Sequence, residues 1–201
     1  MFIEIADEIH EQDELTRLDT GLADWLHLNA QLGLTRVIRV LTWLGSPAVV
    51  LPVAALVGAL WWKHKRFARA ALIWAGVFGG LLLNTALKYA FSRARPAWDE
   101  PLGAAHGFSF PSGHVAGATL LYGSVALLLF RDHISWRTRA AVLAILGLLI
   151  AIVSFTRLYL GVHYLSDVLA AQAIAWAWLA LCVTALDTLR RRRAWLQEKS
   201  S

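Results

Sequence analysis

Five long stretches of this chain contain no charged side chain, and this leaves few possible folds. Each stretch is close to the roughly 20 residues that a helix needs to cross a bilayer. A water-soluble bundle can hold one or two such helices at its centre, but five leave no helix with a polar face for the outside. The hydrophobic fraction of 58% points the same way. We therefore predict an all-α, polytopic transmembrane bundle with about five spans, at Val40–Trp62, Ala70–Leu87, Val115–Phe130, Ala140–Thr156 and Val168–Leu186.

Basic residues gather in three segments that would share one face of this bundle. By the positive-inside rule this face is cytoplasmic. The net charge of +5 therefore needs no nucleic acid to explain it, and the basic tail can contact anionic membrane lipids. The opposite face should be periplasmic or external in a bacterial inner membrane. The basic segments are Lys63–Arg69, Arg131–Arg139 and Arg190–Arg193. The chain divides into an acidic N-terminal segment (1–39), a transmembrane domain (40–189) and a basic cytoplasmic tail (190–201).

The N-terminal segment has a different character, because it carries eight of the fourteen acidic residues. Its apolar residues recur at helical spacing, at Leu15, Leu18, Leu22, Trp25 and Leu26. This pattern predicts an amphipathic helix that lies on the outer membrane interface. For residues 1–14 a solvated arm is an equal alternative.

Polar residues at two predicted helix ends on the outer face favour anion binding. Lys88 lies at the exit of the second span, Arg95 follows it, and Pro96 should end the helix there. Arg157 closes the fourth span, and His163 comes just after it. Asp167 lies four residues further, where one helical turn brings its carboxylate beside the imidazole. Taken singly, such cations can simply reach for the interface, and a His–Asp pair can be local solvation.

The segment FPSGHVAG supplies a third part of the same face. Ser112 can cap a new helix, Gly113 lets a ligand approach the backbone, and His114 stands on the first turn. The unpaired amides of such a helix start bind anions. The three segments together therefore predict a phosphate pocket formed by Lys88, Arg95, Arg157 and the Ser112–Gly113 amides.

Two histidines in a cationic pocket can divide the work of phosphoryl transfer. Asp167 would hold one ring nitrogen of His163 protonated, which leaves the other as a nucleophile toward phosphorus. His114 would donate a proton to the departing oxygen. We expect no metal ion and no cofactor, since the nearby cations would repel a divalent ion and already supply its charge neutralisation. His106 is interpreted as an exposed loop residue.

These segments resemble the signature of the type 2 phosphatidic acid phosphatase superfamily, K-x6-RP, PSGH and SR-x5-H-x3-D. They match it in order and spacing, with Thr156 in place of the serine. The resemblance implies an all-helical core and a metal-independent phosphatase with His163 as nucleophile and His114 as general acid. It also implies the phosphate binders Lys88, Arg95, Ser112, Gly113 and Arg157. Six spans are usual in bacterial members, whereas five are found here, with the acidic amphipathic segment in place of the first helix.

A site at the outer membrane boundary suits a lipid with a phosphate head, because the tail can remain in the bilayer. Phosphatidic acid, phosphatidylglycerol phosphate, undecaprenyl diphosphate and lipid A phosphates all fit this description. A lipid phosphotransferase would use the same phosphohistidine with another acceptor. A vanadate-dependent haloperoxidase has a similar pocket, but those proteins are soluble. A non-enzymatic protein that binds or transports anionic lipids would have no need of two histidines and a carboxylate.

Overall fold

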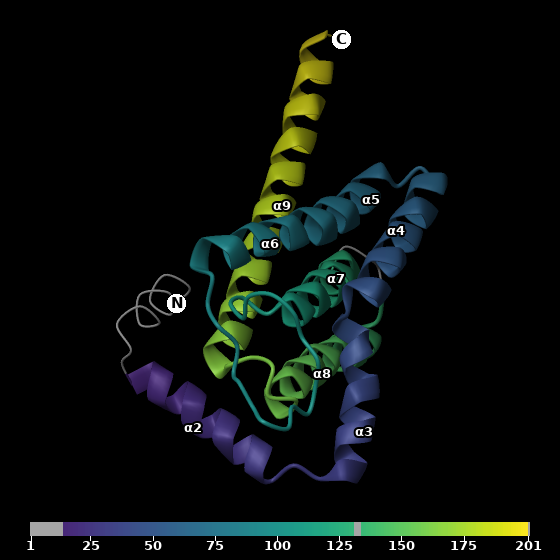
Figure 1. Ribbon diagram of the computed structural model, residues 1–201. Coiled ribbons are helices and arrows are strands. Elements are labelled where there is room, and N and C mark those ends of the chain that lie inside the picture. Colours follow the sequence, from purple (N-terminus) through teal and green to yellow (C-terminus); the bar gives the residue numbers. More distant parts are fainter. Residues whose placement is uncertain (1–13, 131–133, 201) are drawn as a thin grey trace.

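The computed structural model describes residues 14–130 and 134–200. In these ranges the chain forms helices joined by loops, and it contains no strand. Figure 1 shows the helices and their labels. They are α2 (Glu14–Leu28), α3 (Leu32–Leu41), α4 (Pro47–Lys63), α5 (Phe67–Trp74), α6 (Gly80–Phe91), α7 (Gly113–Leu129), α8 (Trp136–Tyr159) and α9 (Leu165–Ser200). A 3-10 turn, η1 (Thr42–Gly45), joins α3 to α4, and a π-helical stretch, η2 (Ala75–Gly79), joins α5 to α6. The predicted all-α class is confirmed.

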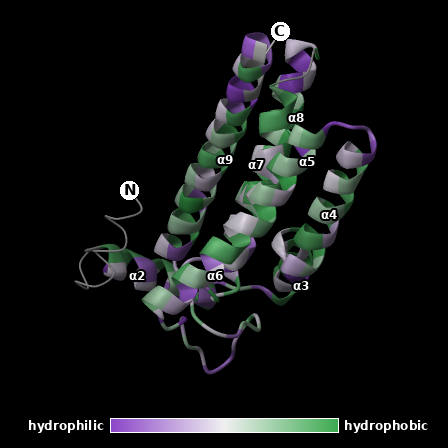
Figure 2. Cartoon of the chain, turned by 90° about the horizontal axis from the view of Figure 1, so that it is seen from above, coloured by the Kyte–Doolittle hydropathy of each residue, from purple (hydrophilic) through white to green (hydrophobic). Residues whose placement is uncertain are grey.

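Within residues 14–130 and 134–200, four helical stretches are long and apolar enough to cross a membrane. They are Leu32–Lys63, Phe67–Phe91, Trp136–Tyr159 and Leu165–Lys199. Hydrophilic residues gather near helix ends and in the loops (Figure 2). The third predicted span, Val115–Phe130, corresponds to α7, which is apolar but shorter. It lies inside the bundle, packed against α4, α5, α6, α8 and α9 (Figure 1). Protein rather than lipid therefore surrounds α7, so it need not match the full bilayer thickness.

The second span ends earlier than its sequence predicts. Pro96 was expected to end this helix, but α6 stops at Phe91. Ser92 adopts a left-handed conformation with φ 46°, and its amide donates to the Lys88 carbonyl (2.9 Å). This is the closing geometry of a helix end, here without the usual glycine. The chain therefore leaves the helix in time to place Arg93 and Arg95 on a loop.

The helix α2 lies across the end of the bundle that carries this loop (Figure 1). It packs against α8 and α9 through Ala23 and Leu26, whereas Leu18, Trp25 and Leu28 face outward. The predicted amphipathic helix is present, and residues 1–13, which the solvated-arm alternative concerned, lie outside the described residues. Its inner face also buries a carboxylate, that of Asp19, which is 1% exposed. Burying a carboxylate is costly unless it is paired, so this side chain must have strong partners.

The turn η1 packs tightly against the start of α7, and this contact can be tested by mutation. A Cβ added to Gly45 would lie 2.5 Å from Val153 Cγ1 and 2.6 Å from the His114 carbonyl oxygen. Overpacking of this kind typically costs about 1–3 kcal/mol. We expect Gly45→Ala to lower the melting temperature in detergent by roughly 2–10 °C. Gly33→Ala on α3 is the matched control, because a Cβ there meets nothing within 4 Å. Equal melting temperatures for the two variants would contradict this packing.

Candidate active site

The starts of α7 and α9 meet directly, and this brings the two predicted catalytic histidines to one side of the molecule. The Ser112 amide donates to the Asp167 carbonyl oxygen (3.1 Å). His114 therefore stands on the first turn of α7, close to the turn before α9 that carries His163. The charges of Arg157, His163, Arg95 and Lys88 all act on the His114 ring. The structure thus brings together the three segments that the sequence analysis combined.

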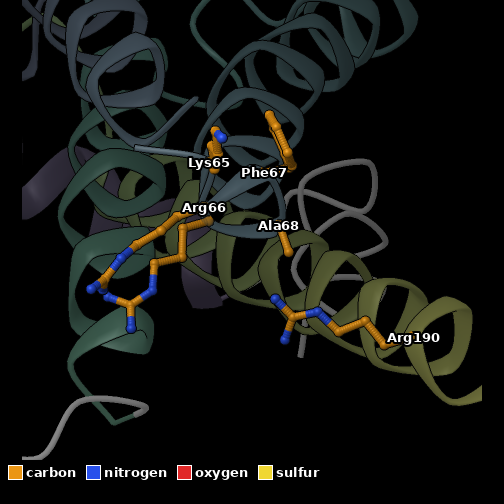
Figure 3. A pocket seen from close by; sticks show the side chains of 6 residues that line it. Lys65, Arg66, Phe67, Ala68 and Arg190 are labelled. Carbon is orange, nitrogen blue, oxygen red and sulfur yellow. The ribbon is translucent and has the colours of Figure 1, made fainter. Parts of the chain in front are cut away.

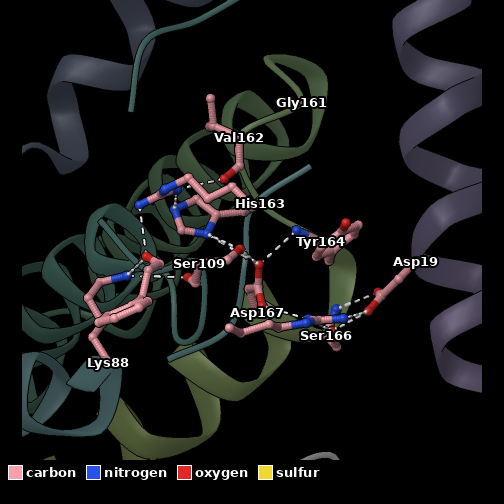
Figure 4. A network of polar contacts seen from close by, with 12 residues as sticks. Asp19, Lys88, Ser109, Gly161, Val162, His163, Tyr164, Ser166 and Asp167 are labelled. Atoms are coloured by element: carbon pink, nitrogen blue, oxygen red, sulfur yellow. Dashed lines mark hydrogen bonds and ion pairs between the residues drawn. The ribbon is translucent and has the colours of Figure 1, made fainter. Parts of the chain in front are cut away.

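The carboxylate of Asp167 is the centre of the polar network in Figure 4. Its Oδ2 lies 3.3 Å from His163 Nδ1 and accepts the Tyr164 amide (2.8 Å) and the Ser109 hydroxyl. A carboxylate can only accept, so Nδ1 of His163 carries the proton and Nε2 has the free lone pair. Ser109 Oγ also lies 3.5 Å from Nδ1. The sequence analysis did not identify Ser109, a buried residue that helps Asp167 to orient the ring.

The nucleophilic nitrogen of His163 has a neighbour that the sequence analysis did not foresee. Its Nε2 lies 3.1 Å from Arg95 Nη1, which can donate to this lone pair. The guanidinium of Arg95 is also bonded to four backbone carbonyls, those of His106, Gly107, Phe108 and Val162. Nε2 of His163 is therefore unprotonated, but in this structure its lone pair is engaged by Arg95. Arg95 can transfer its donor from the imidazole to a phosphoryl oxygen only when an anion lies beside the ring.

The remaining predicted phosphate binders line the same place. Lys88 Nζ donates to the carbonyls of Phe108 (2.8 Å) and Ser109 (3.3 Å), which fixes the ammonium beside the loop. Arg157 is 4% exposed and donates from Nη1 to Thr42 Oγ1 (2.8 Å), while its Nε has no protein partner among the described residues. A buried donor without a partner calls for an explanation. An anion that accepts from Arg157 Nε provides one.

The PSGH segment is placed as expected, with one difference. Ser112 occupies the N-cap position of α7, but its side chain makes no capping hydrogen bond. Its Oγ is buried and has no partner in the described part of the chain. The expected cap is therefore wrong, and the hydroxyl remains available to a ligand. A Cβ on Gly113 would lie 3.7 Å from Asn84 Nδ2 and 3.8 Å from Lys88 Cε, so these two side chains lie next to the backbone here.

A second ion-pair system supports Asp167 from the side of α2. Arg93 Nη1 donates to Asp167 Oδ1 (2.7 Å) and to Ser166 Oγ (2.7 Å), and its Nη2 donates to Asp19 Oδ2 (2.8 Å). Asp19 in turn accepts from the Ser166 amide (2.9 Å) and the Ser166 hydroxyl. Burial opposes the charge of Arg93, but Asp167 and Asp19 together raise its pKa. Arg93 is therefore a permanent cation between two carboxylates, a role that the sequence analysis did not assign.

The charges of the site leave a positive excess that suits a phosphate dianion. Four cationic side chains face two carboxylates, which leaves an excess of two positive charges at neutral pH. The cations are Lys88, Arg93, Arg95 and Arg157, and the carboxylates are Asp19 and Asp167. Among the described residues, no three His, Cys, Asp or Glu side chains cluster as a metal site would require. The geometry can thus hold a phosphoryl group through protein donors.

Two cavities lie at opposite ends of the bundle and differ in chemistry. One of about 500 Å³ adjoins the site through Arg157, and its wall includes Arg39, Thr42 and Trp43. The other, of about 550 Å³, lies at the α4–α5 turn and is lined by basic and apolar side chains, among them Lys65, Arg66 and Arg190 (Figure 3). No imidazole or carboxylate lines this second cavity, so we assign it no reaction.

The protonation state of His163 can be tested directly. Burial lowers the pKa of His163 to about 4, because removal of the imidazolium from water outweighs the opposing effect of Asp167. The ring should be neutral at pH 7 and gain a proton only as the pH falls toward 4. We expect the ¹³Cε1 resonance of His163 in labelled protein, assigned by its absence from His163→Asn, to titrate well below pH 6.5. A midpoint near 6.5 would show that the ring is hydrated.

Comparisons with known proteins find similar sequences and structures. The family model of the PAP2 superfamily matches residues 69–191. Phosphatidylglycerophosphatase B of Bacillus subtilis (strain 168) is 32% identical over 176 residues, which cover 86% of this chain and 85% of the relative. A crystal structure described as the first transmembrane PAP2 type phosphatidylglycerolphosphate phosphatase, also from Bacillus subtilis, is 28% identical with a TM-score of 0.83, covering 93% and 92% of the two chains. Aquifex aeolicus LpxE shares the fold, with a TM-score of 0.66 at 22% identity over 83% of this chain and 95% of that chain.

Proposed function

The chain belongs to the PAP2 superfamily and is an integral membrane enzyme of the lipid phosphatase class, and from this premise we propose that it hydrolyses a lipid phosphomonoester or diphosphate through a phosphohistidine. The observation that carries the proposal is the pairing of His163 with Asp167, next to a helix start that bears His114. A protein that merely binds anionic lipids has no use for an oriented, neutral imidazole beside a second one.

The geometry suggests how the first step proceeds. The Nε2 lone pair of His163 forms a bond to phosphorus while the bond from phosphorus to the lipid oxygen breaks. Once the phosphate dianion offsets the surrounding cations, His114 is protonated, and it gives this proton to that oxygen, so that the lipid leaves as an alcohol. Arg95 redirects its Nη1 donor from Nε2 to a phosphoryl oxygen, and Arg157 Nε and Ser112 Oγ donate to the others.

The second step releases phosphate and restores the enzyme. His114, now neutral, takes a proton from a water molecule whose oxygen forms the new bond to phosphorus. The bond between phosphorus and Nε2 breaks, and inorganic phosphate leaves. Throughout, Asp167 keeps the proton on Nδ1 and stabilises the positive charge that the ring acquires when it is phosphorylated. No step in this scheme requires a metal ion.

Phosphatidylglycerol phosphate is the first substrate that we propose, since the similar sequence is described as phosphatidylglycerophosphatase B and the similar crystal structure as a phosphatidylglycerolphosphate phosphatase. Phosphatidic acid and undecaprenyl diphosphate are the next candidates, because the phosphate pocket meets a group that they share. We place the enzyme in a bacterial inner membrane with its site toward the periplasm. The basic α4–α5 turn and the C-terminal part of α9 lie at the other end of the bundle, and they support this orientation (Figure 1).

The test is phosphate release from a panel of these lipids in detergent, with and without EDTA. Hydrolysis that survives the chelator supports the metal-independent mechanism, and loss of hydrolysis with EDTA overturns it. Lipids labelled with ³²P in the phosphate separate hydrolase from phosphotransferase. Label recovered as free phosphate supports a hydrolase, and label recovered on a second lipid identifies a phosphotransferase.

A further inference from the structure

The cavity that adjoins the site through Arg157 is also lined by residues of α3 and η1. These residues are Arg39, Thr42 and Trp43. Gly103 and Ala104, of the loop between α6 and α7, line it as well. With a volume of about 500 Å³, the cavity is larger than one phosphate needs. A substrate phosphate bound at Arg157 thus has room for a further group next to it.

Arg39 is held in place in a way that leaves much of its binding capacity unused. Its Nε donates to the Leu102 carbonyl oxygen (2.9 Å), which fixes the guanidinium against the loop. In the described part of the chain, its two Nη groups have no hydrogen-bond or ion-pair partner. Guanidinium groups bind phosphate through pairs of parallel donors, and the Nη groups supply them. A fixed guanidinium with free donors is arranged to receive an anion.

Thr42 is close in the chain to Arg39 and hydrogen-bonded to Arg157. Thr42 follows Arg39 by three positions in a continuous helical run, so the two side chains lie on one face of that run. Thr42 Oγ1 accepts the hydrogen bond from Arg157 Nη1 (2.8 Å). The lining of the cavity therefore includes two arginines and a threonine that accepts a hydrogen bond from one of them. None of the residues lining this cavity is acidic.

We propose that this cavity is a second anion subsite, which binds the phosphate next to the scissile one in lipids that carry two phosphates. The proposal rests on the proposed function and deepens it, because it makes Arg39 the residue that distinguishes such lipids from phosphatidic acid. In phosphatidylglycerol phosphate the second phosphate is the diester that joins glycerol to the lipid. In a polyprenyl diphosphate it is the phosphate attached to the prenyl chain.

The surroundings of the cavity suit the rest of such a lipid. Trp43 lines the cavity and is 58% exposed, and Val40 beside Arg39 is 69% exposed. Both belong to a stretch that is apolar enough to span the membrane, Leu32–Lys63, so we expect their exposed surfaces to face lipid. A headgroup that lies between Arg157 and Arg39 would therefore leave the cavity beside Trp43. Its acyl or prenyl chain could then continue along the lipid-facing side of α3 and α4.

The test compares substrates with one and two phosphates in mixed micelles. We expect Arg39→Gln to lower kcat/KM for phosphatidylglycerol phosphate by roughly tenfold, which is the usual scale for a charge-assisted hydrogen bond. For phosphatidic acid the value should stay within about twofold. Arg39→Lys should recover part of the loss, since it keeps the charge but not the paired donors. Arg36→Gln is the matched control, because it removes an exposed arginine one turn earlier on α3.

Each outcome bears on one proposal. A loss on phosphatidylglycerol phosphate alone supports the subsite and locates it across the glycerol, and a loss on undecaprenyl diphosphate as well supports a subsite for any neighbouring phosphate. An equal loss on phosphatidic acid, or no loss with any lipid, overturns the subsite. Failure of the unmodified enzyme to hydrolyse any of the lipids overturns the proposed function, and it is seen before any variant is compared.

Discussion

Replacing His163 with alanine is expected to lower the rate of phosphate release by a factor of about 10⁴ or more, while phosphate binding changes little. The variant loses the nitrogen that forms the bond to phosphorus, and no other described side chain presents a neutral imidazole in its place. The donors that hold phosphate remain, because Lys88 is fixed by loop carbonyls and Arg157 by Thr42. The measurements are turnover with phosphatidylglycerol phosphate and the thermal shift caused by vanadate or phosphate.

His64→Ala provides the control for this variant, since His64 caps α4 at the other end of the molecule. Its turnover and its thermal shift should both match those of the unmodified protein. Retention of more than about 1% of the turnover in His163→Ala would contradict a covalent role for this residue. Loss of the thermal shift together with turnover would mean that His163 holds the anion rather than attacks it.

Replacing Asp19 with asparagine is expected to have the second largest effect, although Asp19 touches neither histidine. Its carboxylate balances one side of Arg93, and Asp167 balances the other. Removing one partner of a buried ion pair typically costs about 3–5 kcal/mol, because the remaining charge is left uncompensated. Arg93 should then draw Asp167 toward itself and away from His163 Nδ1. We expect kcat to fall by roughly 10- to 100-fold with a small change in KM.

Asp24→Asn is the matched control for Asp19→Asn, because it makes the same chemical change on the exposed side of α2. The titration of His163 should separate a positioning role from general instability. In Asp19→Asn the pKa of His163 should move further down as the support from Asp167 weakens, whereas Asp24→Asn should leave it unchanged. Equal kcat values for the two variants would show that Asp19 has no role in the reaction.

The sequence could predict the bundle because spans of charge-free residues allow few other folds. It could also predict which residues meet, because Lys88, His114 and His163 each lie at a fixed spacing from a helix end on the same face. The structure contains the predicted helices, but the end of the second predicted span lies at a different residue. The helix α6 ends at Phe91 because Ser92 adopts a left-handed conformation. No proline or glycine at this position predicts that end.

The supporting residues could not be predicted because their partners are distant in the chain. Asp19 lies 147 positions from Ser166 and 74 from Arg93, and helical periodicity carries no information about contacts at such separations. Asp19 follows Leu18 in a pattern that indicates an amphipathic helix. In such a helix, an acidic residue is expected on the solvated face. Ser109 gives no local signal either, since a loop serine is common. Arg95 was expected to face phosphate, and its four carbonyl partners depend on how the loop folds back.

The two faces of α2 should make the rate of catalysis depend on the membrane surface around this helix. Leu18, Trp25 and Leu28 project outward from this helix, and Asp19 on its inner face completes the charge balance around Asp167. The surroundings of the outer face of α2 should therefore also affect the position of the Asp19 carboxylate. A detergent that packs poorly around this helix should slow the enzyme even when every span remains folded, and restoring a lipid monolayer should revive it. We therefore expect the rate to depend on the lipid around α2, although the enzyme is itself an integral membrane protein.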